Sequence, residues 1–316
     1  MHDLVIVGAG PAGMTAAIYA QRYGIQATLV DPSPGGVMVS NSCIENYPGL
    51  FKKSGHEIAA AMQEQARELG AKFIKDKVTE IHKIPEGFKL TLAGSPLIQT
   101  RTIIIATGLS KRQFTAKNSE RFTGNGNGIH TSINDLKSFT DLEVAVVGGG
   151  DATAIVAVTL ARVAKAVHII CRTPELTVKP RNLDKLRAEP KIHPILDQTV
   201  AECTGSDRLE AVKLSNGQTL PVQALVVETG YEPRLTFQAP GLNLKTDPEG
   251  YLQVDDGMAT SEPGIFAAGD LTTGSNREHH IVNAVSEGAI SSSSAKAFLR
   301  QKLSEPLRGS NTSPFF

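Results

Sequence analysis

The sequence predicts an α/β protein with two doubly wound halves, and three observations support this. Two short apolar strands each run into a glycine-rich turn, in Val5–Gly13 and in Val144–Thr153. A Thr-Gly pair follows each turn, in Ala106-Thr107-Gly108 and in Glu228-Thr229-Gly230. A Gly269-Asp270 pair comes after the second repeat. This internal duplication predicts two Rossmann-like dinucleotide-binding domains, the second inserted into the first.

The first domain is predicted from apolar runs that end at glycine, proline or polar residues. Its opening strand covers 4–8 and leads into a helix over 11–23, which places alanine and isoleucine on its packing face. A second strand follows at 26–30, and Gly70 closes a helix over 55–70. The remaining strands are expected at 72–75, 78–84, 88–92 and 102–105.

The second domain repeats this order of strands and helices. A strand at 143–147 leads into a helix over 151–163, and a strand over 166–171 follows. Further strands are expected at 198–203, 209–214 and 224–227. Ile265–Asp270 and a helix over 281–299 then return to the first domain. We therefore expect one domain over 1–112 and 240–316, and the inserted domain over 113–239.

Composition excludes several classes of function. The 316 residues contain 32 basic and 32 acidic side chains, without long charged runs, so we expect no nucleic-acid partner. No apolar stretch approaches the roughly 18–20 residues that span a bilayer, and no signal peptide is visible. Three scattered cysteines and no Cys-x-x-Cys fit a cytoplasmic protein. We expect no membrane contact and no metal site.

The first glycine turn has the pattern of a dinucleotide site. Gly8 permits the tight turn, Gly10 lets the backbone approach a pyrophosphate, and Gly13 allows close packing of helix and strand. The pyrophosphate would lie at the positive end of the helix that begins near Pro11. Asp31, 23 residues after Gly8, is placed to bind adenosine ribose hydroxyls.

The second turn keeps Gly148 and Gly150 but has Thr153 at the third glycine position, which loosens the packing without forbidding it. Cys171 follows the second strand of this domain, so no carboxylate is available there for an NAD ribose. Only Arg172 is available for the 2′-phosphate of NADP. The site therefore suits FAD, NADH, NADPH or no nucleotide, and the sequence does not separate these.

The cysteines divide into two kinds. Cys171 and Cys203 each end an apolar strand, which indicates inert core thiols. Cys43 lies in a polar loop after Gly35-Gly36, which makes it a candidate for a redox role.

These residues resemble the low-molecular-weight thioredoxin reductase family over nearly the whole chain. The matching motifs are Gly8–Gly13, Gly35-Gly36 with Glu45–Gly49, Ala106-Thr107-Gly108, Gly148–Asp151 and Pro263–Asp270. The resemblance implies an FAD domain, an inserted NADPH domain and a homodimer. It also implies that Asp270 bonds the ribityl chain.

In that family, Arg-Gln faces the flavin where this chain has His279 and His280. We therefore treat these two histidines, with Cys43, as candidate catalytic residues, since a histidine near a helix N-terminus can stabilise a reduced, anionic ring. The predicted FAD ligands are Gly8, Gly10, Pro11, Ala12, Gly13, Asp31, Gly35, Gly36, Val37, Asn41, Asn46, Val78, Ala106, Thr107, Gly108, Gly269, Asp270, His280 and Ile281. The predicted ligands of the second nucleotide are Gly148, Gly150, Asp151, Ala152, Thr153 and Arg172.

One departure from the family affects the function. The family's Cys-x-x-Cys should fall near 131–135, where this chain reads Thr131-Ser132-Ile133-Asn134-Asp135. Hydroxyl and amide groups do not exchange electrons as a dithiol does. The ordinary mechanism is therefore excluded unless Cys43 substitutes.

Two kinds of relative are then the best candidates. Thioredoxin-reductase-like ferredoxin–NADP reductases carry aromatic C-terminal extensions, with which Phe315-Phe316 is compatible, but Thr177 falls where a second arginine is expected. The diflavin-linked disulfide oxidoreductases place a second FAD in the NADPH position.

We therefore expect an FAD-dependent oxidoreductase that passes electrons between FAD and a second nucleotide, either FAD or NAD(P)H. Its outer partner would be a small redox protein or a disulfide. The alternatives are a ferredoxin or flavodoxin–NAD(P) reductase, and a flavin-binding redox sensor with little turnover.

Overall fold

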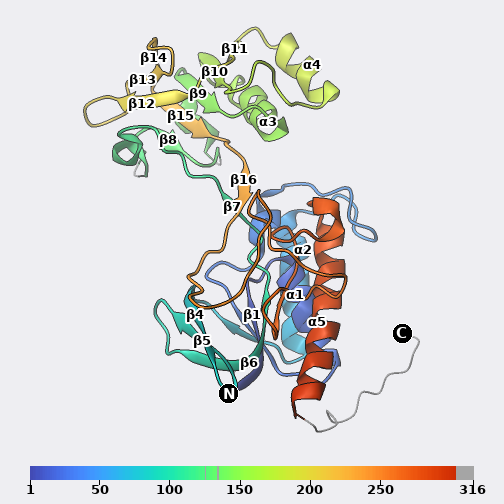
Figure 1. The fold of residues 1–316 in the computed structure, drawn as a ribbon. Helices are drawn as coiled ribbons and strands as arrows, with labels where there is room; N and C mark the ends of the chain where they lie inside the picture. Colours follow the sequence, from blue (N-terminus) through green and yellow to red (C-terminus); the bar gives the residue numbers. More distant parts are fainter. Residues whose placement is uncertain (125, 134, 304–316) are drawn as a thin grey trace. The chain divides into compact units, whose positions relative to one another are not determined.

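The computed structural model describes residues 1–124, 126–133 and 135–303, and it divides into two compact units (Figure 1). Unit 1 contains Met1–Ser110 and the chain from Glu232 onward, and unit 2 is Lys111–Tyr231. The divisions thus fall at 110/111 and 231/232, compared with 112/113 and 239/240 predicted from the sequence. The Phe315-Phe316 tail lies outside the described residues.

Unit 1 is built on a seven-stranded sheet in the order β3-β2-β1-β6-β5-β4, with β17 also paired to β6. The β1, β2, β3, β6 and β17 strands are parallel, whereas β4 and β5 form an antiparallel hairpin. The bounds are β1 His2–Val7, β2 Ala27–Val30, β3 Lys72–Ile74, β4 Val78–Ile84, β5 Gly87–Leu92, β6 Ile98–Ile105 and β17 Ile265–Ala267.

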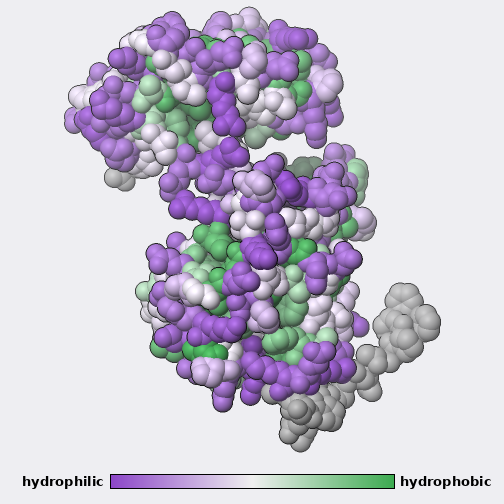
Figure 2. Space-filling view, viewed as in Figure 1, coloured by the Kyte–Doolittle hydropathy of each residue, from purple (hydrophilic) through white to green (hydrophobic). Residues whose placement is uncertain are grey.

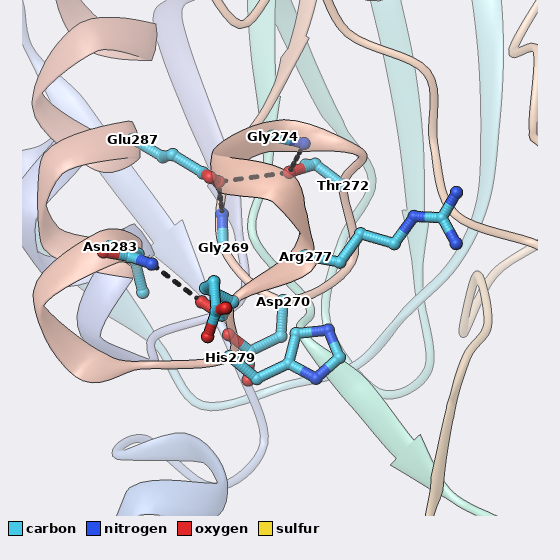
Figure 3. Close-up of a pocket in the computed structure, with 10 residues that line it drawn as sticks. Gly269, Asp270, Thr272, Gly274, Arg277, His279, Asn283 and Glu287 are labelled. Carbon is cyan, nitrogen blue, oxygen red and sulfur yellow. Dashed lines mark hydrogen bonds between the residues drawn. The ribbon is translucent and has the colours of Figure 1, made fainter.

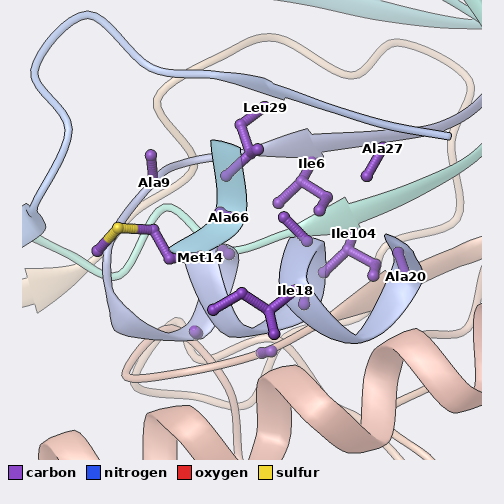
Figure 4. Close-up of a cluster of buried hydrophobic side chains, with 14 of the residues drawn as sticks. Ile6, Ala9, Met14, Ile18, Ala20, Ala27, Leu29, Ala66 and Ile104 are labelled. Atoms are coloured by element: carbon purple, nitrogen blue, oxygen red, sulfur yellow. The ribbon is translucent and has the colours of Figure 1, made fainter. Parts of the chain in front are cut away.

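Three helices pack on the sheet of unit 1: α1 (Pro11–Arg22), α2 (Gly55–Glu68) and α5 (Ile281–Leu303). Because side chains alternate along a strand, Leu4 and Ile6 join the core cluster that includes α1, while Val5 joins the cluster on the other face. Figure 4 shows Ile6, Ile104 and Leu29 above the helix residue Ile18. Burial of such side chains contributes about 1.5–3 kcal/mol each.

Unit 2 repeats this arrangement with a five-stranded parallel sheet in the order β11-β10-β9-β15-β8. A three-stranded antiparallel sheet, β12-β13-β14, is separate. The bounds are β8 Ile129–His130, β9 Glu143–Val147, α3 Asp151–Leu160, β10 Ala166–Ile170, α4 Pro180–Ala188, β11 Ile192–Ile195, β12 Val200–Thr204, β13 Ala211–Leu214, β14 Thr219–Pro221 and β15 Ala224–Val227.

The chain enters unit 2 through β7 (Leu109–Lys111) and leaves it through β16 (Tyr231–Pro233), and these strands pair as a two-stranded sheet. In unit 1 the strand before the glycine turn, β1, lies between β2 and β6. In unit 2 the corresponding strand, β9, lies between β10 and β15. This is the strand order of a dinucleotide-binding domain. The predicted fold class, with the second domain inserted into the first, is therefore confirmed.

Short 3₁₀ helices cover Gly36–Ser40, Ser119–Phe122, Leu136–Phe139 and Gly274–Arg277.

Several elements were not predicted. The short strand β11 contains Pro194, which argues against a strand in a sequence but is tolerated here because β11 is at the sheet edge. Helix α4, which begins with Pro180, was also missed, and the helix expected over 151–163 ends at Leu160.

Polar side chains cover most of the visible face of each unit (Figure 2). Within the described part of the chain, no helix combines the length and apolar character needed to cross a membrane.

Candidate dinucleotide sites

The first glycine turn joins β1 to α1, and each glycine in it has its own physical reason. Gly8 has φ of +108°, and a Cβ there would overlap the Ala106 carbonyl oxygen. A Cβ on Gly13 would overlap the Gly8 carbonyl oxygen, so helix and strand meet closely. Gly10 differs, since the nearest atom to a Cβ there is the Gly36 Cα at 3.8 Å. The Gly10 backbone thus faces open space that a ligand can occupy.

A cavity at the carboxyl ends of β1, β2 and β6 brings four predicted ligands together: Gly8, Asp31, Val78 and Thr107. The Thr107 hydroxyl is buried and has no hydrogen-bond partner in the structure. Such a group costs about 1–3 kcal/mol unless a ligand or water satisfies it. The Asp31 carboxylate accepts hydrogen bonds from the Ala9 amide (2.6 Å) and the Ser33 amide (2.7 Å). Asp31 therefore braces the turn and lines the cavity, and both features suit the adenosine half of FAD.

Two further predicted segments reach the N-terminus of α1. The Gly35 amide donates to the Ala9 carbonyl (2.8 Å), which brings the Gly35-Gly36 loop against the turn. A Cβ on Gly269 would lie 3.0 Å from the Ala12 Cβ, so the loop after β17 reaches the same helix end. Three predicted ligands are exposed: Val37, Asn41 and Asn46. Pro11, Gly108 and Ile281 are half-buried, and Ala106 is buried.

Figure 3 shows the pocket formed by the loop after β17 and the start of α5. Asp270 and His279 lie on one side of it, and Glu287 reaches from α5 toward Gly269 and Thr272. Burial raises the pKa of Asp270 above its ordinary value; the charge of Glu287 adds to this, and His279 and His280 oppose it. Asp270, the predicted ligand of the ribityl chain, is therefore partly buried.

The two candidate histidines lie directly before α5, which begins at Ile281, as the sequence predicts. The His280 carbonyl accepts from the Ala284 amide (3.1 Å), which makes His280 the residue that caps the helix. His279 stacks on Tyr251, with ring centroids 5.8 Å apart. Arg277 lies over the same ring, 5.0 Å from its centroid.

Sequence reasoning missed Glu287, Arg277 and Tyr251. Arg277 pairs with Asp247 (2.8 Å) and with Glu249, so it ties the turn that carries Tyr251 to the pocket. A signal for Glu287 was present in the sequence, as the only Asp, Glu, Lys or Arg between Glu278 and Lys296.

The turn between β9 and α3 reproduces the first one closely. Gly148 has φ of +154°, and a Cβ there would overlap the Glu228 carbonyl oxygen. No atom lies within 4 Å of a Cβ on Gly150, so this backbone also faces open space. Thr153 is 1% exposed, and its hydroxyl has no hydrogen-bond partner. The threonine is thus accommodated at the third glycine position.

Residues after β10 fold back onto this turn. The Thr177 amide donates to the Gly149 carbonyl (2.7 Å), and a Cβ on Gly149 would overlap the buried Cys171 sulfur. The Asp151 carboxylate accepts from the Lys179 amide and the Asn182 side chain, both at 2.9 Å, and these bonds lower the pKa of Asp151. Asp151 is therefore occupied within the protein, whereas Ala152 and Arg172 are exposed.

The three thiols are free, and their surroundings differ. Cys171 is 2% exposed, and burial raises the pKa of Cys203 to about 11. Cys43 is exposed. We expect a chromogenic disulfide to react with one thiol per native chain and with all three after denaturation. Cys43→Ser should abolish the fast phase, and a fast phase that persists would contradict this assignment.

Among the described residues, no group of three or more His, Cys, Asp or Glu side chains is arranged to hold a metal ion. Two glycine turns, each at the carboxyl ends of parallel strands in its own sheet, define a protein with two Rossmann-like domains. Residues 2–288 match the model of the pyridine nucleotide-disulphide oxidoreductase family. The chain belongs to this family.

Similar proteins of known class support this family membership. The thioredoxin reductase of Listeria innocua is 34% identical over 308 residues, covering 95% of each chain. Among solved structures, Lactococcus lactis thioredoxin reductase in its FR conformation gives a TM-score of 0.83 at 31% identity, covering 95% of this chain and all of that one. The structure of T. acidophilum thioredoxin reductase gives a TM-score of 0.79 at 28% identity, covering 93% of this chain and 97% of that one. The chain is an FAD-dependent oxidoreductase of the thioredoxin reductase-like class.

Proposed function

We propose that unit 1 holds FAD, that unit 2 holds a second nucleotide, and that electrons pass between the two and on to or from a disulfide or a small redox protein. The observation that carries this proposal is the repeated geometry of the two turns. Gly10 and Gly150 each begin a helix with an extended backbone and open space beyond the Cα. Both turns thus suit a pyrophosphate at a helix N-terminus.

In unit 1, the groups that would hold FAD are the Gly10 backbone, the unpaired Thr107 hydroxyl, Asp31 and Asp270. When bound, FAD supplies the hydride and electron chemistry at its N5 atom. The protein would contribute position and electrostatics: the α1 N-terminus would face the pyrophosphate, while the half-buried Asp270 and the exposed His279 line a pocket.

In unit 2, the side chains favour a nucleotide without a 2′-phosphate. Arginines bind such a phosphate well because they donate in a fork, and here Thr173 and Thr177 stand beside the single Arg172. The Thr173 hydroxyl donates to the Glu175 carbonyl (2.8 Å), so it is already used within the loop. An ADP half from a second FAD or from NADH fits these groups better than NADPH does.

The disulfide step would not use the ordinary dithiol, because the sequence has no Cys-x-x-Cys. Cys171 and Cys203 are buried, which leaves Cys43 as the exposed thiol. The named relatives are thioredoxin reductases, so a thioredoxin-like protein is the proposed partner. The homodimer and the cytoplasmic location remain predictions. The second candidate function, a ferredoxin or flavodoxin–NAD(P) reductase, is favoured by the lack of a dithiol.

The deciding experiment is to denature the purified protein and quantify flavin and nicotinamide per chain. Two FAD per chain would support the second flavin site and a disulfide partner. One FAD, with flavin bleaching faster under NADH than NADPH, would support a nicotinamide in unit 2 and the reductase function. One FAD that no donor reduces would overturn the proposed electron transfer and leave the redox sensor.

A further inference from the structure

Glu287 is a buried carboxylate whose hydrogen bonds hold the loop on both sides of Asp270. Its side chain comes from α5 and is 3% exposed. One oxygen, Oε2, accepts from the Gly269 amide (2.7 Å) and from the Thr272 hydroxyl (3.1 Å). The Thr272 hydroxyl oxygen in turn accepts from the Gly274 amide (3.1 Å), which extends the bracing along the loop (Figure 3).

A buried charge is costly unless its surroundings compensate for it. In unit 1, Glu262 is equally buried at 4% exposed, but the Lys83 ammonium lies 2.5 Å from it. The hydrogen-bond donors to Glu287 are instead a backbone amide and a hydroxyl. Asp270, His279 and His280 are the titratable groups near it on the loop, while Arg277 and Glu278 also line the pocket.

The Lys83 ammonium compensates for the buried charge of Glu262 at a place outside the pocket. The bonds of Glu287 instead converge on the residues that flank one predicted ligand. We propose that Glu287 is a positioning residue for the FAD site, which fixes the backbone around Asp270 and thereby sets how tightly the chain holds FAD. This inference rests on the proposed assignment of Asp270 to FAD.

The test measures the Kd of deflavinated protein for FAD by fluorescence titration. Glu287→Ala removes the acceptor of both bonds, and we expect FAD binding to weaken about 10–100-fold. Glu287→Gln keeps a carbonyl oxygen for both bonds and should stay within about threefold of the unmodified protein. Thr272→Val removes one donor and should weaken binding by a smaller factor in the same direction. It also tests the proposal if Glu287→Ala does not fold.

Glu262→Ala is the matched control, since it removes a carboxylate of equal burial that lies outside the pocket. We expect it to lower the unfolding temperature and to leave the Kd for FAD unchanged. A double-mutant cycle then asks whether Glu287 acts through Asp270. Glu287→Ala should cost much less affinity in an Asp270→Asn background than in the unmodified chain.

Three results would overturn the proposal: a Kd within twofold of the unmodified value for both Glu287→Ala and Thr272→Val, an equal loss in Glu262→Ala, or full additivity in the cycle. Failure of the proposed function is distinguishable from these, because it would appear first as absence of FAD in the unmodified protein.

Discussion

Gly10→Val is expected to give a folded chain that no longer retains FAD. The Gly10 backbone has φ of −77° and ψ of −172°, a conformation that valine adopts readily. A Cβ there would make only an ordinary contact, with the Gly36 Cα at 3.8 Å, so the free energy of unfolding of the FAD-free protein should change by less than about 1 kcal/mol. The added methyl groups would occupy the surface where the pyrophosphate should lie. We expect at least about 100-fold weaker FAD binding, equal to about 2.7 kcal/mol, measured by equilibrium titration.

Gly150→Val is the matched variant in unit 2. Its backbone is also extended, with φ of −104° and ψ of −174°, and no neighbour lies within 4 Å of its Cβ. It should retain the FAD of unit 1 and lose the second nucleotide, so a content of two FAD per chain would fall to one. Loss of all flavin in Gly150→Val, with retention in Gly10→Val, would reverse the assignment of the two units.

Asp270→Asn is expected to have opposite effects on stability and on FAD binding. Burial raises the pKa of Asp270 in the folded state, so the protonated carboxyl is favoured there. Its stabilising contribution is therefore fully present below the unfolded value near 3.9, and is lost as pH rises through the raised folded pKa. At neutral pH the ionised group costs stability, which asparagine removes. At neutral pH the FAD-free variant should therefore unfold at a higher temperature than the unmodified protein.

The same change should weaken FAD binding about tenfold, because the neutral amide replaces a charged hydrogen-bond acceptor. Thermal unfolding between pH 4 and 8 measures the stability effect, and the difference between variant and unmodified protein should grow with pH and then level off. Asp256→Asn, at an exposed carboxyl of the same unit, should show neither effect. A variant with no gain at neutral pH, or with undiminished flavin content, would contradict the expectation.

Features set by a few adjacent residues were predictable from the sequence. The turn around Gly8 needs a positive φ and a close approach of helix and strand. Glycines at a fixed spacing predict both of these features. The insertion of a second domain into the first was predicted from the duplication of that turn. The hydrogen bond between Glu287 and Gly269 was not predictable, because it joins residues 18 positions apart in sequence and depends on how α5 packs. The stacking of His279 on Tyr251 likewise depends on a turn held by Arg277, whose partners are far away in sequence.

The edge strand β11 shows a different limit. Pro194 removes an amide donor, which matters in a central strand and not at an edge, and the sequence does not state which position a strand occupies. For Cys171, the apolar strand before it predicted burial correctly. Its position beneath Gly149 came only from the way residues 173–177 fold back over the turn.

The paired strands β7 and β16 bring the two ends of the inserted unit side by side. A domain whose two ends are neighbours can be removed or exchanged as one unit, because the strand order of the sheet that receives it does not change. The strands of the unit 1 sheet pair with one another without any strand from unit 2. Unit 2 can therefore be exchanged as one piece while the pairing of the unit 1 strands stays unchanged. A protein engineer can use the same two strands as junctions for chimeras.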